Sequence, residues 1–233
     1  MFLRGIDFGT VLGASGVQGF SGEGYWFHHL PFGPDFSGAT FVAKTTTLEA
    51  RRGNMPLKKN FMPRELFPRC IVADFRKGIA LNAVSLSGPG ARDLFLDGRL
   101  LTHDKPFFLS FMSLANTPTE CSIELLKFVE MFQMFKSSFL SPVGLQINYS
   151  CPNVAGHVTP KVEELIRQVE TDLETASVLG IPLVPKFNAL LPTAAAVHIS
   201  RNPNCDALCV SNTIPWDDLP GILDRRELFG TDE

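Results

Sequence analysis

Residues 143–156 read Val-Gly-Leu-Gln-Ile-Asn-Tyr-Ser-Cys-Pro-Asn-Val-Ala-Gly. The first six form a short apolar run of the kind found in buried strands, and the proline and glycine behind them predict a loop. Asn148, Cys151 and Asn153 lie at or in this loop. Carboxamides offer both donors and acceptors, so the two asparagines are suited to reading the N–H and C=O groups of a planar ring. A thiol has an unperturbed pKa of about 8.5, which makes Cys151 a candidate general base.

Further apolar runs lie on both sides of this stretch, at residues 10–14, 39–45, 106–111, 182–187 and 206–211. Helical periodicity appears between the later runs, at residues 119–137 and 158–179. Because parallel strands need a crossover long enough to hold a helix, this alternation predicts right-handed βαβ units and a parallel sheet. The expected fold class is α/β, a TIM (β/α)8 barrel that is incomplete, with about six of its eight βα units present.

Polar side chains mark the carboxyl ends of these runs: Ser15, Lys44, Asn148, Lys186 and Asn212. In a parallel barrel those ends converge on one mouth, where active sites lie. A lysine within an apolar strand needs a partner or a function, whereas an asparagine after a strand also commonly caps a turn. The proline-interrupted segment 51–87 breaks the alternation, and we expect it to be a long connection that caps or lines the site.

Composition narrows the class of protein. The 233 residues are 45% hydrophobic and carry a net charge of −3, which predicts a single domain over residues 1–233 and makes nucleic acid and anionic membranes poor partners. No secretory signal is recognised at the start, and the apolar runs are too short to cross a bilayer. Five cysteines without a CxxC pair favour a reducing, cytoplasmic setting, and neither they nor the histidines have metal-ligand spacing.

Six separated motifs resemble the dihydroorotate dehydrogenase family in the family's own order. Residues 148–153, Asn-Tyr-Ser-Cys-Pro-Asn, resemble its substrate loop. The other five resemble its first flavin-contacting turn, its second-strand lysine with the Arg-x-Gly-Asn element, its Asn-x-x-Gly-Leu segment, its later lysine strand and its Asn-Thr pair. They lie at residues 11–16, 44–47 with 51–54, 81–86, 184–187 and 210–213. Together the matches cover nearly the whole chain.

The resemblance implies roles for the matching positions. Cys151 would be the catalytic base, with Lys44 bridging substrate and cofactor. The implied substrate-binding residues are Lys44, Asn82, Val84, Ser85, Leu86, Asn148, Asn153, Asn212 and Thr213. The implied contacts of an FMN cofactor are Ala14, Ser15, Lys44, Thr45, Asn148 and Lys186. No metal is implied.

The implied reaction is oxidation of dihydroorotate to orotate in pyrimidine biosynthesis, with Cys151 removing a proton while a hydride passes to the flavin. Membrane-linked relatives carry serine at the base position, so the cysteine indicates the soluble class. The electron acceptors of that class include fumarate, or a nicotinamide cofactor reached through an iron–sulfur subunit. A homodimer is the implied assembly.

Three departures from the family pattern stand out. Ala50 replaces a proline, and Ser85 replaces a glycine close to the expected substrate. The sequence also ends after the sixth strand, before the glycine-rich turns that grip the flavin phosphate. Six strands cannot close an eight-stranded barrel, so we expect either a longer natural protein or a second chain that supplies the remainder.

Other functions stay open at this stage. A dihydropyrimidine dehydrogenase relative would share the cysteine loop, although such relatives tend to carry histidine where Asn153 stands. A Schiff-base aldolase would use Lys186 in a barrel strand. A non-catalytic barrel fragment would need none of these side chains.

Overall fold

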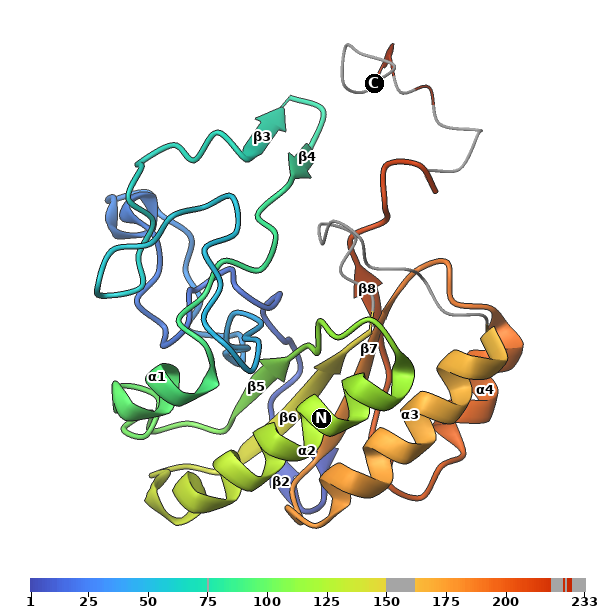
Figure 1. Cartoon of the computed structure of the whole chain (residues 1–233). Coiled ribbons are helices and arrows are strands. Elements are labelled where there is room, and N and C mark those ends of the chain that lie inside the picture. Colours follow the sequence, from blue (N-terminus) through green and yellow to red (C-terminus); the bar gives the residue numbers. More distant parts are fainter. Residues whose placement is uncertain (75, 150–161, 219–223, 225, 228–233) are drawn as a thin grey trace.

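The structure is a computed structural model, and it describes residues 1–74, 76–149, 162–218, 224, 226 and 227. Its centre is a four-stranded parallel sheet in the order β5-β6-β7-β8, with helices between successive strands (Figure 1). The strands are β5 (Phe107–Phe111), β6 (Val143–Asn148), β7 (Leu183–Asn188) and β8 (Cys209–Asn212). The predicted α/β class and parallel sheet are confirmed, and all four strands overlap their predicted runs.

The first two predicted strands are present only as isolated parallel bridges. Leu12 pairs with Thr40, Val42 with Phe108, and Thr46 with Phe111. Backbone hydrogen bonds, such as Ala43 N–H to the Phe108 carbonyl at 2.8 Å, join these segments side by side. Six parallel segments therefore follow one another in chain order, as a βα barrel requires, although within the described residues they do not close into a ring.

Three helices cover one face of the sheet, namely α2 (Pro118–Phe135), α3 (Val162–Ser177) and α4 (Thr193–Ser200) (Figure 1). Helix α2 begins with a capping box: Thr117 Oγ1 accepts from the Glu120 backbone N–H at 3.2 Å, and the Glu120 carboxylate accepts from the Thr117 N–H at 3.1 Å. The short η2 (Lys136–Ser138) follows it. The predicted helices at 119–137 and 158–179 are confirmed, the second within the described residues only.

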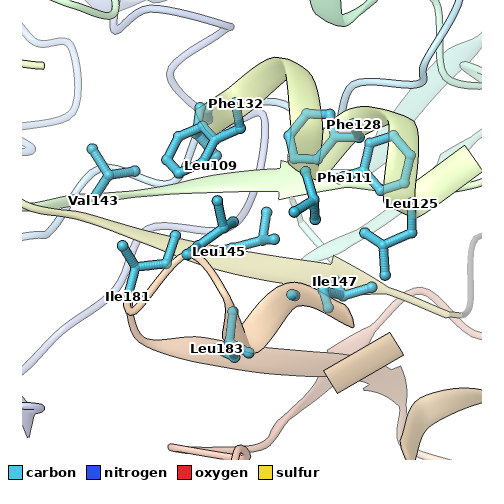
Figure 2. Packing of buried hydrophobic residues seen from close by; sticks show 14 of the residues in the cluster. Leu109, Phe111, Leu125, Phe128, Phe132, Val143, Leu145, Ile147, Ile181 and Leu183 are labelled. Carbon is cyan, nitrogen blue, oxygen red and sulfur yellow. The ribbon is translucent and has the colours of Figure 1, made fainter. Parts of the chain in front are cut away.

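The main hydrophobic core lies between these helices and the sheet (Figure 2). Alternate strand residues point into it, among them Leu109, Phe111, Leu145 and Ile147, because successive side chains of a strand face opposite sides. From α2, the Phe128 ring stacks on Phe111 with a centroid distance of 4.3 Å. The residues that alternate with these core residues along each strand therefore face the side of the sheet that has no helices.

The N-terminal segment covers one end of that helix-free face. It forms a small antiparallel hairpin of β1 (Phe2–Leu3) and β2 (Ile6–Asp7). Phe8 packs on Phe108 with ring centroids 4.4 Å apart, in a second apolar cluster that includes Val42 and Val184. Arg4 Nε lies 3.0 Å from both carboxylate oxygens of Asp206, just before β8. The amino ends of the parallel segments are thus closed by apolar contacts, and the carboxyl ends carry the polar residues.

The connection between residues 51 and 87 contains a hairpin that sequence analysis did not predict. Strands β3 (Ile71–Asp74) and β4 (Ile79–Asn82) pair antiparallel and stand away from the main sheet (Figure 1). Much of the hairpin is exposed, so it lacks the continuous apolar pattern of a buried strand. Two short helices complete the fold, η1 (Trp26–His29) and α1 (Ala91–Leu96). No helix in the described part of the chain is long and apolar enough to cross a membrane.

Candidate functional site

Three predicted site residues meet at the carboxyl ends of β6, β7 and β8. Asn148 and Lys186 are register partners on neighbouring strands, and Asn212 is the register partner of Asn188 one strand further on. Asn212 Nδ2 donates to Asn148 Oδ1 at 2.8 Å. Asn148 and Lys186 are 6% and 7% exposed, so their polar groups are withdrawn from bulk water. The sheet therefore presents two amides and a lysine together, as the sequence predicted.

A chain of hydroxyl groups links the first two parallel segments to β5. Ser15 Oγ donates to the Ala43 carbonyl at 2.8 Å and lies 3.0 Å from Thr45 Oγ1, which in turn lies 2.8 Å from Ser110 Oγ. Thr45 and Ser110 are buried. The predicted cofactor residues Ser15 and Thr45 are thus in direct contact, whereas the neighbouring Ala14 is exposed.

Lys44 is half-buried and connects this region to the segment before α1. Its ammonium group donates to the Ser87 carbonyl and lies 4.8 Å from the centre of the Phe20 ring. Gly16 packs on the lysine stem, because a Cβ at this position would lie 3.1 Å from Lys44 Cγ, and its φ of +88° also favours glycine. The turn that the resemblance assigns to flavin contact therefore touches the lysine assigned to the same ligand.

The predicted substrate segment 84–86 has an unusual backbone. Ser85 and Leu86 both adopt the left-handed region, with φ of +58° and +54°, a conformation that costs a non-glycine residue roughly 1 kcal/mol or more. Arg51 holds the turn, since its Nε donates to the Ser85 carbonyl at 2.8 Å and its Nη2 donates to Ser85 Oγ at 3.1 Å. Ser85 therefore occupies a glycine-favouring position with compensating hydrogen bonds. Asn82 lies in β4, within the hairpin that stands apart from the sheet.

Gln146 is a buried polar residue of the site that sequence analysis did not single out. It pairs in register with Ser110, and its neighbours Leu145 and Ile147 face the helices, so its side chain lies on the helix-free face. It is 4% exposed, and Oε1 has no hydrogen-bond partner in the described residues. Buried polar atoms are normally satisfied, so this orphaned acceptor fits a site that takes a ligand with a hydrogen-bond donor. The signal in the sequence was a glutamine within an apolar run.

A second network that sequence analysis missed joins α3, α2 and Tyr149. Asp172 of α3 is 2% exposed, and its two carboxylate oxygens accept hydrogen bonds from Ser122 Oγ at 2.6 Å and Tyr149 Oη at 3.0 Å. Burial raises the pKa of Asp172 to about 6, partly opposed by the two hydrogen bonds. Burial, together with the nearby Asp172, raises the pKa of Tyr149 well above its usual value. A small pocket beside this network is lined by Asn148, Tyr149 and Asp172.

The backbone and ring of Tyr149 are also held in place. Its N–H donates to the Lys186 carbonyl at 3.0 Å, and its ring stacks on Phe187 at 5.3 Å with an interplanar angle of 12°. Tyr149, the last described residue before position 150, is therefore anchored to β7 as well as to α3. The sequence does not predict the contacts of Asp172, because a charged residue in a helix is normally expected on the solvent-exposed face.

The candidate base Cys151 and the substrate residue Asn153 lie outside the described residues. Thr213 is described; it follows β8 and is exposed. Within the described part of the chain, no group of three or more histidine, cysteine, aspartate or glutamate side chains is placed to hold a metal ion.

Together these residues define an α/β protein with two lysines, buried amides and hydroxyls around the carboxyl ends of parallel segments. Such an arrangement is suited to a small, planar, anionic ligand. The chain is also similar to proteins of Streptococcus pyogenes named "Putative dihydroorotate dehydrogenase A (fumarate)". The serotype M5 protein is 30% identical over 203 residues, which is 82% of this chain and 57% of that protein.

A serotype M3 protein of the same name is 29% identical over the same shares of each chain. The serotype M1 protein is 30% identical over 182 residues, which is 75% of this chain and 50% of that protein. The chain thus spans little more than half the length of these relatives. No family model matches it. The similarity supports a relationship with the dihydroorotate dehydrogenases, in agreement with the motif order.

Proposed function

We propose that this chain is part of an FMN-dependent dihydroorotate dehydrogenase, an oxidoreductase that converts dihydroorotate to orotate. The observation that carries the proposal is the meeting of Asn148, Lys186 and Asn212 on one face of the sheet. The names of the relatives support the same reaction. The family resemblance also implies a TIM barrel, a cytoplasmic homodimer and a role in pyrimidine biosynthesis, and these belong to the proposal.

The described residues fit the ring of a flavin, because Gln146 Oε1 is an unsatisfied buried acceptor on the helix-free face of the sheet. Ala14, Ser15, Lys44, Thr45, Asn148 and Lys186 would hold the cofactor, which when bound supplies the hydride acceptor. The buried ammonium group of Lys186 would balance negative charge at the ring edge.

The substrate is proposed to bind through its carboxylate and its ring amides. Lys44 would attract the carboxylate, while Asn148, Asn212 and Asn153 would pair with the ring N–H and C=O groups. Thr213 and the segment from Asn82 to Leu86 would border the pocket, with Arg51 fixing the turn at Ser85. Cys151 would take the proton from the carbon next to the one that loses hydride. Fumarate, or a nicotinamide reached through an iron–sulfur subunit, would reoxidise the enzyme.

The proposal predicts that dihydroorotate reduces the bound flavin. Protein loaded with FMN should lose its yellow absorbance anaerobically when dihydroorotate is added, and dihydrouracil should leave the colour unchanged. Cys151→Ala should slow bleaching by roughly 10²- to 10⁴-fold, the usual contribution of one general base. The variant should still bind orotate, seen as a shift of the flavin spectrum.

Cys121→Ala provides a matched thiol control, since this cysteine lies in α2 and has no proposed catalytic role. Bleaching by dihydrouracil but not dihydroorotate would favour a dihydropyrimidine dehydrogenase. Full activity of the Cys151→Ala variant would show that Cys151 is not the catalytic base.

A further inference from the structure

A positively charged hollow lies in the connection between residues 51 and 87, and it shares Arg51 with the site described above. We call it the basic hollow, and its charged lining residues are Arg51, Arg52, Lys58, Lys59, Arg64 and Glu65. Pro56, Leu57 and Phe61 form the apolar part of its wall. Five cations thus surround one concave surface with a single carboxylate among them.

The charge of the basic hollow contrasts with the rest of the molecule. The whole chain carries a net charge of −3, whereas five of its 21 lysines and arginines line this one hollow. None of the five cations takes part in an ion pair within the described residues; the pairs found there involve other side chains. Like charges gathered in one concavity repel one another and raise the local positive potential, which an anion relieves.

The walls that carry these cations are built from hydrogen-bonded turns. One wall is the turn from Leu57 to Arg64, where Lys58 N–H donates to the Met62 carbonyl at 2.8 Å and Arg64 N–H donates to the Pro56 carbonyl at 2.9 Å. Arg64 Nε also donates to the Leu57 carbonyl at 3.0 Å. Arg99 lies 5.1 Å from the centre of the Phe61 ring and supports the turn.

The other wall is formed where Arg51 and Gly88 exchange two backbone hydrogen bonds, each 2.8 Å long. Together with the bonds from Arg51 to Ser85, these contacts fix the start of the cationic stretch. A charged surface that is already ordered loses less conformational entropy when a ligand binds. The guanidinium groups of Arg51 and Arg64, and the backbone that carries Lys58 and Lys59, are therefore held in place before any anion arrives.

We propose that the basic hollow binds a small anion with several adjacent negative oxygens, of the polyphosphate class. Guanidinium and ammonium groups together suit phosphate oxygens, the first as planar forks and the second as point charges. The concave shape favours a small ligand over an extended nucleic acid, which would need a basic stripe. Arg51 borders both the basic hollow and the turn at Ser85, whereas the proposed redox chemistry uses neither Lys58 nor Lys59.

Calorimetric titration of the purified chain with pyrophosphate tests the proposal. We expect saturable binding to one site at about 0.15 M salt, where screening removes weak contacts between exposed charges. Lys58→Ala/Lys59→Ala should weaken this binding at least about tenfold, since each tenfold corresponds to about 1.4 kcal/mol. Lys58→Arg/Lys59→Arg should retain it.

Arg92→Ala/Lys127→Ala is the matched control, because it removes two exposed cations from α1 and α2. Thermal melting of each variant shows whether it is folded, and only folded variants are compared. Absence of saturable binding would overturn the proposal, as would equal weakening in the control pair or unchanged binding in Lys58→Ala/Lys59→Ala. Failure of the dihydroorotate test would leave this result intact, because pyrophosphate binding is measured without substrate or flavin.

Discussion

Asp172 shows how one buried side chain couples stability to pH. Its carboxylate is held by Ser122 and Tyr149, two neutral donors, and burial raises its pKa to about 6. The folded state therefore keeps a proton that the unfolded chain, with a pKa near 3.8, releases earlier. Stability contributed by this group is present at low pH and falls as pH rises between about 4 and 6.

Asp172→Asn should flatten that dependence. The amide has nearly the same shape but does not titrate, so the loss of stability over this window should shrink by up to about 3 kcal/mol, the equivalent of two pKa units. Urea unfolding at pH 4, 5, 6 and 7 measures the effect. Asp93→Asn, on an exposed position of α1, serves as the control and should leave the slope unchanged. Parallel pH curves for wild type and Asp172→Asn would contradict the interpretation.

Helix α2 illustrates stabilisation at the scale of an element. The helix packs five buried side chains against the sheet, and its first turn is closed by the Thr117–Glu120 capping box. Without a cap, the first backbone N–H groups would lack partners. The box therefore defines where α2 begins, which in turn sets the positions of Ser122 and Cys121 near Asp172.

Thr117→Ala should lower the free energy of unfolding by about 1 kcal/mol, the usual cost of losing an N-cap side chain. Thr119→Ala, two residues later at an exposed position in the same turn, should change it by less than about 0.5 kcal/mol. Urea denaturation of the two variants gives the comparison. Equal effects would mean that the cap contributes little to the folded protein.

At the scale of the whole molecule, the N-terminal segment covers the amino-end part of the helix-free face of the sheet. Phe8 is 1% exposed and packs with Phe108, Val42 and Val184, which come from three different parallel segments. The Arg4–Asp206 contact joins the N-terminal hairpin to the segment just before β8. Long-range contacts of this kind make the sheet and the N-terminal hairpin one cooperative unit.

Phe8→Ala should destabilise the protein by about 3–5 kcal/mol, because it removes a buried aromatic ring and leaves a cavity. Phe2→Ala is a matched control, since Phe2 is 73% exposed in the same segment; its effect should stay within about 0.5 kcal/mol. The midpoints and slopes of urea unfolding curves give the change in the free energy of unfolding for both variants. A small effect of Phe8→Ala would show that the segment unfolds independently of the sheet.

Several features were predictable because they depend on local pattern. The four central strands and both long helices overlap their predicted ranges, because continuous apolar runs and 3.6-residue periodicity can be recognised without knowledge of the tertiary structure. The meeting of Asn148, Lys186 and Asn212 followed from their places at the ends of parallel strands. The β3–β4 hairpin was missed because its residues are largely exposed and follow no apolar alternation.

By itself, the sequence determined the α/β class, the parallel order of the segments and the edge where polar residues gather, because periodicity and strand direction are local properties. Only the tertiary structure decided which side chains touch: the Asp172–Tyr149 contact, the orphaned acceptor of Gln146 and the left-handed turn at Ser85. These depend on burial and on partners far away in the chain. Such partners come together only when the helices pack on the sheet.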